Sequence, residues 1–284
     1  MTHATLPGPV EPFAPGADAA TLRYLTDGCR RYGDLWAIPP DGQLAAAGDQ
    51  PLVVLNDIDA IHEVLVKRQT EFEKGLGFER VRMLLGDGLI VADGDHWRRR
   101  RQMLQPAFGR EALRGFGPAI AKAIARRAPV WEAHADSGQP LDVSSEAEHL
   151  ALRIILRAIF GPDLEALDAT DGGNPFDLIV EVRERDLRFA HRFRQLWPVV
   201  RDVVERRRRA GLDGPPTDFL GHYLAARDRE SGAGLDDEGV VDEVMTLVIA
   251  GHEAPRASAL SRACCSGCRA RSDQAQAMVA ALVS

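Results

Sequence analysis

The chain has 284 residues, a formal net charge of −7 and 45% hydrophobic residues, which is ordinary for a globular protein of one large domain or two smaller ones. The acidic balance argues against general nucleic-acid binding, although arginines cluster at 98–101 and 206–209. No apolar run approaches the roughly 18 to 20 residues of a membrane-spanning helix, and the first residues do not resemble a signal peptide. We therefore expect a cytoplasmic protein without a membrane anchor, and we interpret 206–209 as a solvated helix face.

The first part of the chain predicts an extended lead followed by a small sheet. Residues 1–20 are rich in proline and show no helical or strand period. Short apolar runs between Pro, Gly and Asp residues predict two strands, and Asn56 or Asp57 is placed to cap a helix. The predicted elements are helices over 21–32 and 57–66 and strands over 34–38 and 51–55.

Helical periodicity dominates after residue 93, whereas 73–93 is Gly-rich and predicted to be irregular. The predicted helices span 94–105, 110–135, 142–160, 175–187, 189–209, 218–229 and 240–255. The last of them is apolar nearly all round from 244 to 250, which is typical of a helix buried in a large core. Pro255 lacks a backbone donor, so we expect this helix to break there.

One predicted helix carries a cation on its apolar face. Trp97, Arg101 and Leu104 stand at i, i+4 and i+7, and the two apolar members mark their face as buried. A buried guanidinium is costly unless an anion meets it, and Asp93 and Asp95 lie a turn or more away. The anion is therefore another protein segment or a bound carboxylate or phosphate. The alternative is a solvated basic face with only Trp97 packed inside.

The apolar run of the last helix ends in polar residues. His252 and Glu253 follow Gly251, whose low helix propensity suggests a packing or access requirement. Buried ionisable groups either pair with one another or serve a site. The alternative is that the chain is already rising to the surface at this point.

These two stretches resemble a known family. Gly94 to Phe108, with Trp97-x-x-x-Arg101, resembles the helix that cytochrome P-450 monooxygenases use to hold the heme propionates. Ala250-Gly251-His252-Glu253 is similar to the start of the family's central-helix signature, Ala-Gly-x-Glu-Thr-Thr. Weaker similarity covers much of 22–255. The resemblance implies a mainly α fold with a small N-terminal β-sheet, and it makes the anion at Arg101 a heme propionate.

The resemblance also implies a set of site residues around a heme b. It implies that Trp97 and Arg101 bind the heme propionates, with His96 and Arg98 as weaker candidates. It places Ala250 and Gly251 over the heme face, with room for oxygen, and gives proton relay to Glu253. It places Leu89 and Ile90 on the substrate side, with core packing as the alternative.

The activity implied by the resemblance is insertion of one oxygen atom of O2 into a small apolar organic substrate. An electron-donor protein such as a ferredoxin or flavin reductase is the expected partner. The sequence departs from the family in two ways. Ala254 stands where the family has Thr, and no Glu-x-x-Arg helix or Phe-x-x-Gly-x-x-x-Cys thiolate loop follows. Glu111 and Arg114 have the Glu-x-x-Arg spacing, but they lie too early in the chain to form that helix.

These departures predict an incomplete fold without the heme-ligand half, and absent or impaired activity. We expect a lead over 1–20, a partial domain over 21–255 and an atypical tail over 256–284. The tail is rich in Arg, Ser, Ala and Cys, and our hypothesis is that residues from about 254 onward are read out of the original frame.

Two other functions remain open on the residues alone. One is a non-catalytic helical remnant that binds heme or serves an interaction. The other is a metal site built from Cys265 and Cys268 with Cys264 or His252, although one Cys-x-x-Cys pair supplies only half of a structural zinc site.

Overall fold

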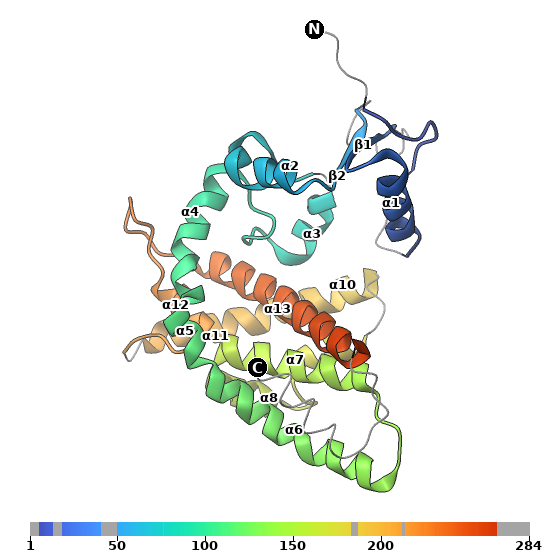
Figure 1. Ribbon diagram of the computed structural model, residues 1–284. Coiled ribbons are helices and arrows are strands. Elements are labelled where there is room, and N and C mark those ends of the chain that lie inside the picture. The colour runs from blue at the N-terminus through green and yellow to red at the C-terminus, as the bar shows by residue number, and fades with distance from the viewer. Residues whose placement is uncertain are drawn as a thin grey trace. The chain divides into compact units, whose positions relative to one another are not determined.

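The computed structural model describes residues 6–13, 19–40, 50–75, 77–182, 187–211 and 214–265, and the side chains of its last helix as far as His252 (Figure 1). Two compact units divide the chain, one over residues 1–80 and one over 81–284. The described residues form many helices and one two-stranded sheet, which confirms the predicted fold class. Within these ranges no helix combines the length and apolar content needed to cross a membrane.

The first unit contains the sheet. Its elements are α1 (Ala19–Tyr32), β1 (Leu35–Ile38), β2 (Leu52–Leu55), α2 (Ile58–His62), the π-helical turn η1 (Glu63–Lys67) and the 3-10 turn η2 (Gln69–Glu71). The strands pair antiparallel, with Leu35 opposite Leu55. Asp57 caps α2 by accepting a hydrogen bond from the backbone N–H of Ala60 at 2.7 Å. The helices and strands predicted for this part are confirmed.

Close packing of α1 on the sheet requires a glycine. Trp36 of β1 is fully buried, and a Cβ added to Gly28 of α1 would lie 2.2 Å from its indole ring. Any other residue at position 28 would push the helix away from the strand. The sheet and α1 therefore share one small core around Trp36.

The second unit is built from helices. Its elements are α3 (Gly77–Leu85), which begins in the first unit, α4 (Gly94–Leu104), η3 (Gln105–Phe108), α5 (Arg110–Gly115), α6 (Gly117–Ser137), α7 (Val143–Phe160), α8 (Asp163–Asp168), η4 (Pro175–Asp177), α9 (Leu178–Glu181), α10 (Leu187–Arg194), α11 (Leu196–Ala210), α12 (Phe219–Ala225) and α13 (Asp237–Cys265). The prediction of irregular structure over 73–93 is wrong at α3, because Val81, Leu84 and Leu85 share one helix face and pack on the core.

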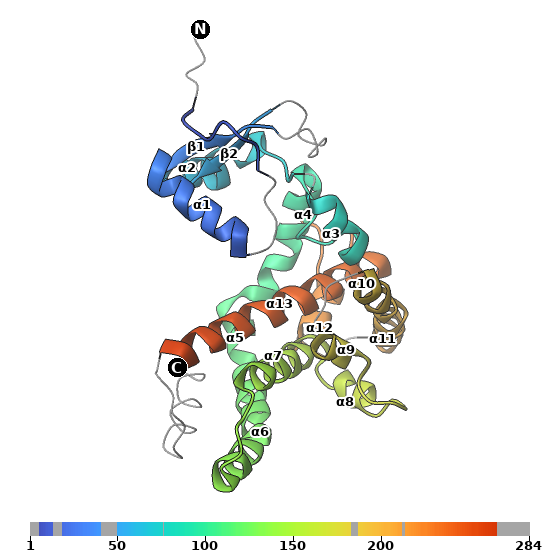
Figure 2. The same ribbon diagram turned by 90° about the vertical axis from the view of Figure 1, so that its right-hand side faces the viewer.

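The core of this unit lies around α13. Five of its side chains are fully buried, namely Val240, Val241, Val244, Met245 and Val248. The helix packs along α7 and α11, and it lies beside α7 in Figure 1 and in Figure 2. The prediction of a helix buried through a large core is confirmed.

The expected break at Pro255 is wrong, because α13 continues to Cys265. A proline inside a helix removes one hydrogen bond, and the helix can bend and continue when the turns before it are held in place. The turns of α13 before Pro255 are held by the core. The first ten residues of the predicted atypical tail, 256–265, are therefore helical.

Candidate functional site

Burial changes steadily around the circumference of α4. Arg100 is 9% exposed, Trp97 is half-buried and Arg101 is exposed. Successive residues of a helix are about 100° apart, so Trp97 lies between the two arginines in angular position. The predicted inward direction of Arg101 is therefore wrong. The buried guanidinium of this helix belongs to its neighbour, Arg100.

The other arginines of the run face solvent in different surroundings. Arg98 forms an exposed ion pair with Asp95, one turn earlier. Arg101 forms no ion pair with any residue that the structure describes. Its position in the last turn of α4 is favourable for a cation, because the carbonyl end of a helix carries partial negative charge. Arg101 is therefore available to an anion from outside the described residues.

His96 has a protein partner. Its Nε2 atom lies 3.1 Å from Oδ2 of Asp87, which also pairs with Arg82. Both His96 and Asp87 are about half exposed, so this contact contributes little to stability. A propionate role for His96 would have to compete with Asp87, and it stays a prediction, as does that of Arg98.

The segment 86–91 connects α3 to the turn before α4 and is fastened to α13. The backbone N–H of Asp87 donates to Oδ2 of Asp242 at 2.8 Å. The backbone N–H of Leu89 donates to Oε1 of Glu243 at 2.9 Å. Leu89 and Ile90, the predicted substrate-lining residues, are partly buried and pack against the main core. The structure thus shows the core packing that was their alternative, and the lining role stays a prediction.

Arg100 completes this polar cluster. Its Nη1 atom donates to the carbonyl oxygen of Asp87 at 2.7 Å and to Oε1 of Glu243 at 3.2 Å. The side chains of Arg100 and Glu243 are only 11% and 2% exposed. Two neighbouring segments of the chain, 86–91 and α4, therefore meet the distant helix α13 at one buried ion pair.

Burial governs the acidity of the two carboxyl groups in the cluster. Desolvation raises the pKa of Glu243 to about 7, although Arg100 and the N–H of Leu89 act in the opposite direction. Desolvation also raises the pKa of Asp242, against the hydrogen bond from Asp87 and the charge of Arg100. Sequence reasoning missed Arg100, Asp242 and Glu243. The available signal was two acidic residues at the start of a helix that is apolar nearly all round.

The predicted residues of α13 lie further along that helix. Ala250 and Gly251 are half-buried, and His252 is buried. A Cβ added to Gly251 would lie 2.5 Å from the side chain of Ile155 on α7, so the glycine lets the two helices pack closely. This is the packing requirement expected from its low helix propensity. The side chains of Glu253, Cys264 and Cys265, and the whole of Cys268, lie outside what the structure describes.

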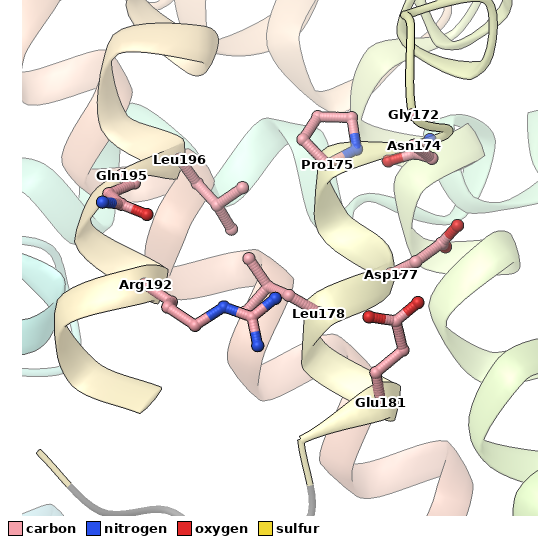
Figure 3. Close-up of a pocket in the computed structure, with 9 residues that line it drawn as sticks. All are labelled: Gly172, Asn174, Pro175, Asp177, Leu178, Glu181, Arg192, Gln195 and Leu196. Carbon is pink, nitrogen blue, oxygen red and sulfur yellow. The ribbon is translucent and has the colours of Figure 1, made fainter. Parts of the chain in front are cut away.

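The pockets that the structure describes lie elsewhere. One of about 270 Å³ lies beside α9, where Figure 3 shows Asp177 and Glu181 on one wall and Arg192 and Gln195 on the other. A groove of about 760 Å³ runs between α6 and α7, and its cations include Lys122 and Arg126. Neither is lined by a residue of α4 or α13.

Comparison with known proteins gives a consistent result. The sequence matches the family Cytochrome P450 over residues 31–197. Two curated relatives from Streptomyces melanosporofaciens, cyclooctat-9-en-7-ol 5-monooxygenase and cyclooctatin synthase, are each 28% identical. The alignments cover 69% and 80% of this chain, and 44% and 52% of the relatives. The chain thus spans about half the length of these relatives.

Solved structures show the same fold. A crystal structure of a cytochrome P450, CYP102L1, is similar with a TM-score of 0.68 at 23% identity, over 89% of this chain and 58% of that one. The heme domain of cytochrome P450DA is similar with a TM-score of 0.64 at 25% identity, over 88% of this chain and 57% of that one. The similarity covers more than half of each of these solved chains and shows a shared fold.

Proposed function

The chain belongs to the cytochrome P450 family, and we propose that residues 81–265 form the part of a heme monooxygenase that holds the heme propionates and packs over the oxygen side of the heme. The observation that carries this proposal is the family match over residues 31–197, which includes Trp97 and the exposed cation Arg101 one turn later. Heme is the cofactor of the family, and when bound it supplies the activation of O2. The protein binds and orients the reacting groups and excludes water.

The residues of α4 fit the acidic edge of a heme. Arg101 has no carboxylate partner among the described residues, and its planar guanidinium suits a propionate. Trp97, one turn earlier, carries an indole N–H that can donate a second hydrogen bond. We assign Trp97 and Arg101 to the propionates, and we place His96 and Arg98 at the rim of the same site.

The described residues supply no thiolate loop as a candidate for the iron ligand. The printed sequence contains no Phe-x-x-Gly-x-x-x-Cys segment. Among the described residues no group of three His, Cys, Asp or Glu side chains could hold a metal ion. The proposal therefore concerns how this chain holds the porphyrin edge, and it assigns no iron ligand.

The residues of α13 are assigned to the oxygen side. Ala250 is small and half-buried, so it leaves space beside the helix, and Gly251 keeps α13 close to α7. We assign proton relay to Glu253, because a carboxyl group at the end of an apolar run is suited to that task. Leu89 and Ile90 are assigned to the substrate side of the same space.

The names of the relatives support a proposal for the substrate class, and the electron donor is proposed from the family resemblance. These relatives include cyclooctat-9-en-7-ol 5-monooxygenase and pentalenene oxygenase, from Streptomyces species. We propose a small apolar organic substrate together with O2, and a ferredoxin or flavin reductase as electron donor.

A hemin titration of the purified chain tests the propionate site. We expect Arg101→Met to weaken hemin binding about tenfold or more, because one charge-assisted hydrogen bond pair is lost. Arg99→Met is the matched control, because Arg99 is an exposed arginine of the same helix and has no role in the proposal. With hemin dimethyl ester, which lacks the carboxylates, the effect of Arg101→Met should disappear. Equal hemin affinity of the parent chain and Arg101→Met would contradict the proposal.

A second candidate, a non-catalytic heme-binding protein, is favoured by Ala254 in place of Thr. The carbon monoxide difference spectrum of the reduced, hemin-loaded chain separates the two. We expect no thiolate-type band from this chain. A normal thiolate band would show that a cysteine of the chain does bind the iron, and it would favour the enzyme.

A further inference from the structure

The buried pair of Arg100 and Glu243 joins the three segments on which the proposed heme site depends. Arg100 comes from α4, Glu243 from α13, and the carbonyl of Asp87 from the segment between them. Oε1 of Glu243 accepts from both Arg100 and the backbone N–H of Leu89. Loss of either charged side chain would leave the other buried without its partner.

The segment 86–91 has no room to move on α13. A Cβ on Gly86 would lie 2.2 Å from Oδ1 of Asp242 and 2.5 Å from the ring of Trp197 on α11. A Cβ on Gly88 would lie 2.3 Å from Oγ1 of Thr246. Both glycines are therefore needed for backbone contact, and the segment is held by packing as well as by hydrogen bonds.

The rotation of α4 follows from this attachment. Arg100 and Arg101 are consecutive, so their side chains leave the helix about 100° apart. When Arg100 is held against Glu243, Arg101 must face solvent, and Trp97 must lie between the two directions. The observed exposure of the three residues follows this order.

We propose that Arg100 and Glu243 are positioning residues, which fasten α4 and the segment 86–91 to α13 and thereby set the direction in which Trp97 and Arg101 face the heme propionates. The inference rests on the proposed function for the identity of the anion. The fastening itself rests only on contacts within the protein.

Fluorine NMR of the full chain labelled with 5-fluorotryptophan tests the fastening without heme. The chain has four tryptophans, and Trp97→Phe identifies the signal of Trp97. We expect Arg100→Met and Glu243→Gln to shift the signals of Trp97 and of Trp197, which touches the segment. The signal of Trp131, in α6, should stay in place and so shows that the fold is retained. Arg99→Met is the matched control and should shift none of them.

The double variant Arg100→Met/Glu243→Gln keeps the test valid if a single variant fails to fold. It removes both buried charges, while the amide oxygen of the new side chain remains an acceptor for the N–H of Leu89. We expect this variant to fold with a shifted Trp97 signal. An unchanged Trp97 signal in the folded variants would overturn the fastening.

Hemin binding tests the consequence for the site. We expect the Arg100 variants to bind hemin several-fold to about tenfold more weakly than the parent chain. Their affinity for hemin dimethyl ester should equal that of the parent chain. If Arg101→Met lowers hemin affinity and the Arg100 variants do not, the positioning role is overturned. If neither arginine affects hemin affinity while the Trp97 signal moves, the propionate assignment fails and the fastening stands.

Discussion

Arg207 of α11 donates from Nη1 to both carboxylate oxygens of Asp218, at 3.0 and 2.9 Å. Asp218 is 3% exposed in its side chain, and its Oδ1 atom also accepts from the backbone N–H of Gly221 at 2.7 Å, which caps α12. Arg207 also donates from Nη2 to the carbonyl of Phe160 at 2.8 Å. One arginine of a run predicted to be a solvated face thus ties α7, α11 and α12 together.

Substitution of Arg207 should be strongly destabilising. Arg207→Met leaves the carboxylate of Asp218 buried without a cation, and breaking such a pair costs about 3–5 kcal/mol. We expect the free energy of unfolding in urea, followed by circular dichroism, to fall by that amount. Arg209→Met alters an exposed arginine of the same run and should change it by less than about 0.5 kcal/mol. Similar losses in the two variants would mean that Arg207 has no special structural role.

Substitution of Gly251 should separate two helices. Gly251→Ala places a methyl group 2.5 Å from Ile155, and such overpacking typically costs about 1–3 kcal/mol. In the double variant with Ile155→Ala, the new methyl group occupies vacated space. We therefore expect a loss smaller than the sum of the two single losses. Additive losses in urea unfolding would show that α7 and α13 do not meet at this position.

The stability of the protein should depend on pH through Glu243. Burial raises its pKa to about 7 in the folded state, above the ordinary value of 4.5. The fold thus favours the protonated form, and this stabilisation is complete below pH 4.5 and is lost as the pH rises through 7. The charged and titratable groups around it are Arg100 of α4, Asp242 of α13 and Tyr223 of α12.

Comparison with Glu243→Gln isolates this effect. The variant cannot ionise, so the parent chain should lose stability relative to it between pH 4.5 and 7, by up to about 1.4 kcal/mol per pH unit, and no further above that range. Urea unfolding of both proteins at several pH values measures the difference. A constant difference across the range would show that Glu243 does not titrate there.

Glu146 should have the opposite pH dependence. It accepts from Nε of Arg127 at 2.7 Å and from Nε1 of Trp131 at 2.9 Å. The hydrogen bond from Arg127 holds its pKa below the ordinary value of 4.5, so its stabilisation is present above that pH and is lost as the pH falls through the lowered pKa.

We expect Glu146→Ala to cost about 2–3 kcal/mol at neutral pH, because a charge-assisted hydrogen bond is lost and Trp131 is left without its acceptor. The difference from the parent chain should shrink in acid. Glu146→Gln keeps an acceptor for the indole and should lose less. If Glu146→Ala and Glu146→Gln have equal effects, the contact with Trp131 contributes nothing.

Hydrophobic periodicity was sufficient to predict most of the elements. The strands and α1, α4, α7 and the buried part of α13 lie where the apolar pattern places them. Short breaks were missed. The predicted helix over 189–209 is two helices, α10 and α11. In the one over 175–187, the described residues 175–182 form η4 and the four-residue α9, and Leu187 begins α10. Neither break contains a glycine or proline, which are the residues that would have indicated a helix end in the sequence.

The partner of each arginine could not be predicted from the sequence. Arg100 and Arg101 are identical in type and adjacent in sequence, and a rotation of α4 by about 100° would exchange which of them is buried. The choice is made by Glu243, which lies 143 residues later. A pattern within one helix carries no information about such a distant charge.

The central position of α13 has a consequence for synthesis on the ribosome. Its main partner, α7, ends at Phe160, and the helix begins only at Asp237. Until α13 emerges, the apolar side chains that pack on it have no permanent cover. Contacts of such long sequence separation form slowly. The apolar face of α7 therefore stays without its native cover until that helix arrives, and closure of the second unit is a late event in its biosynthesis.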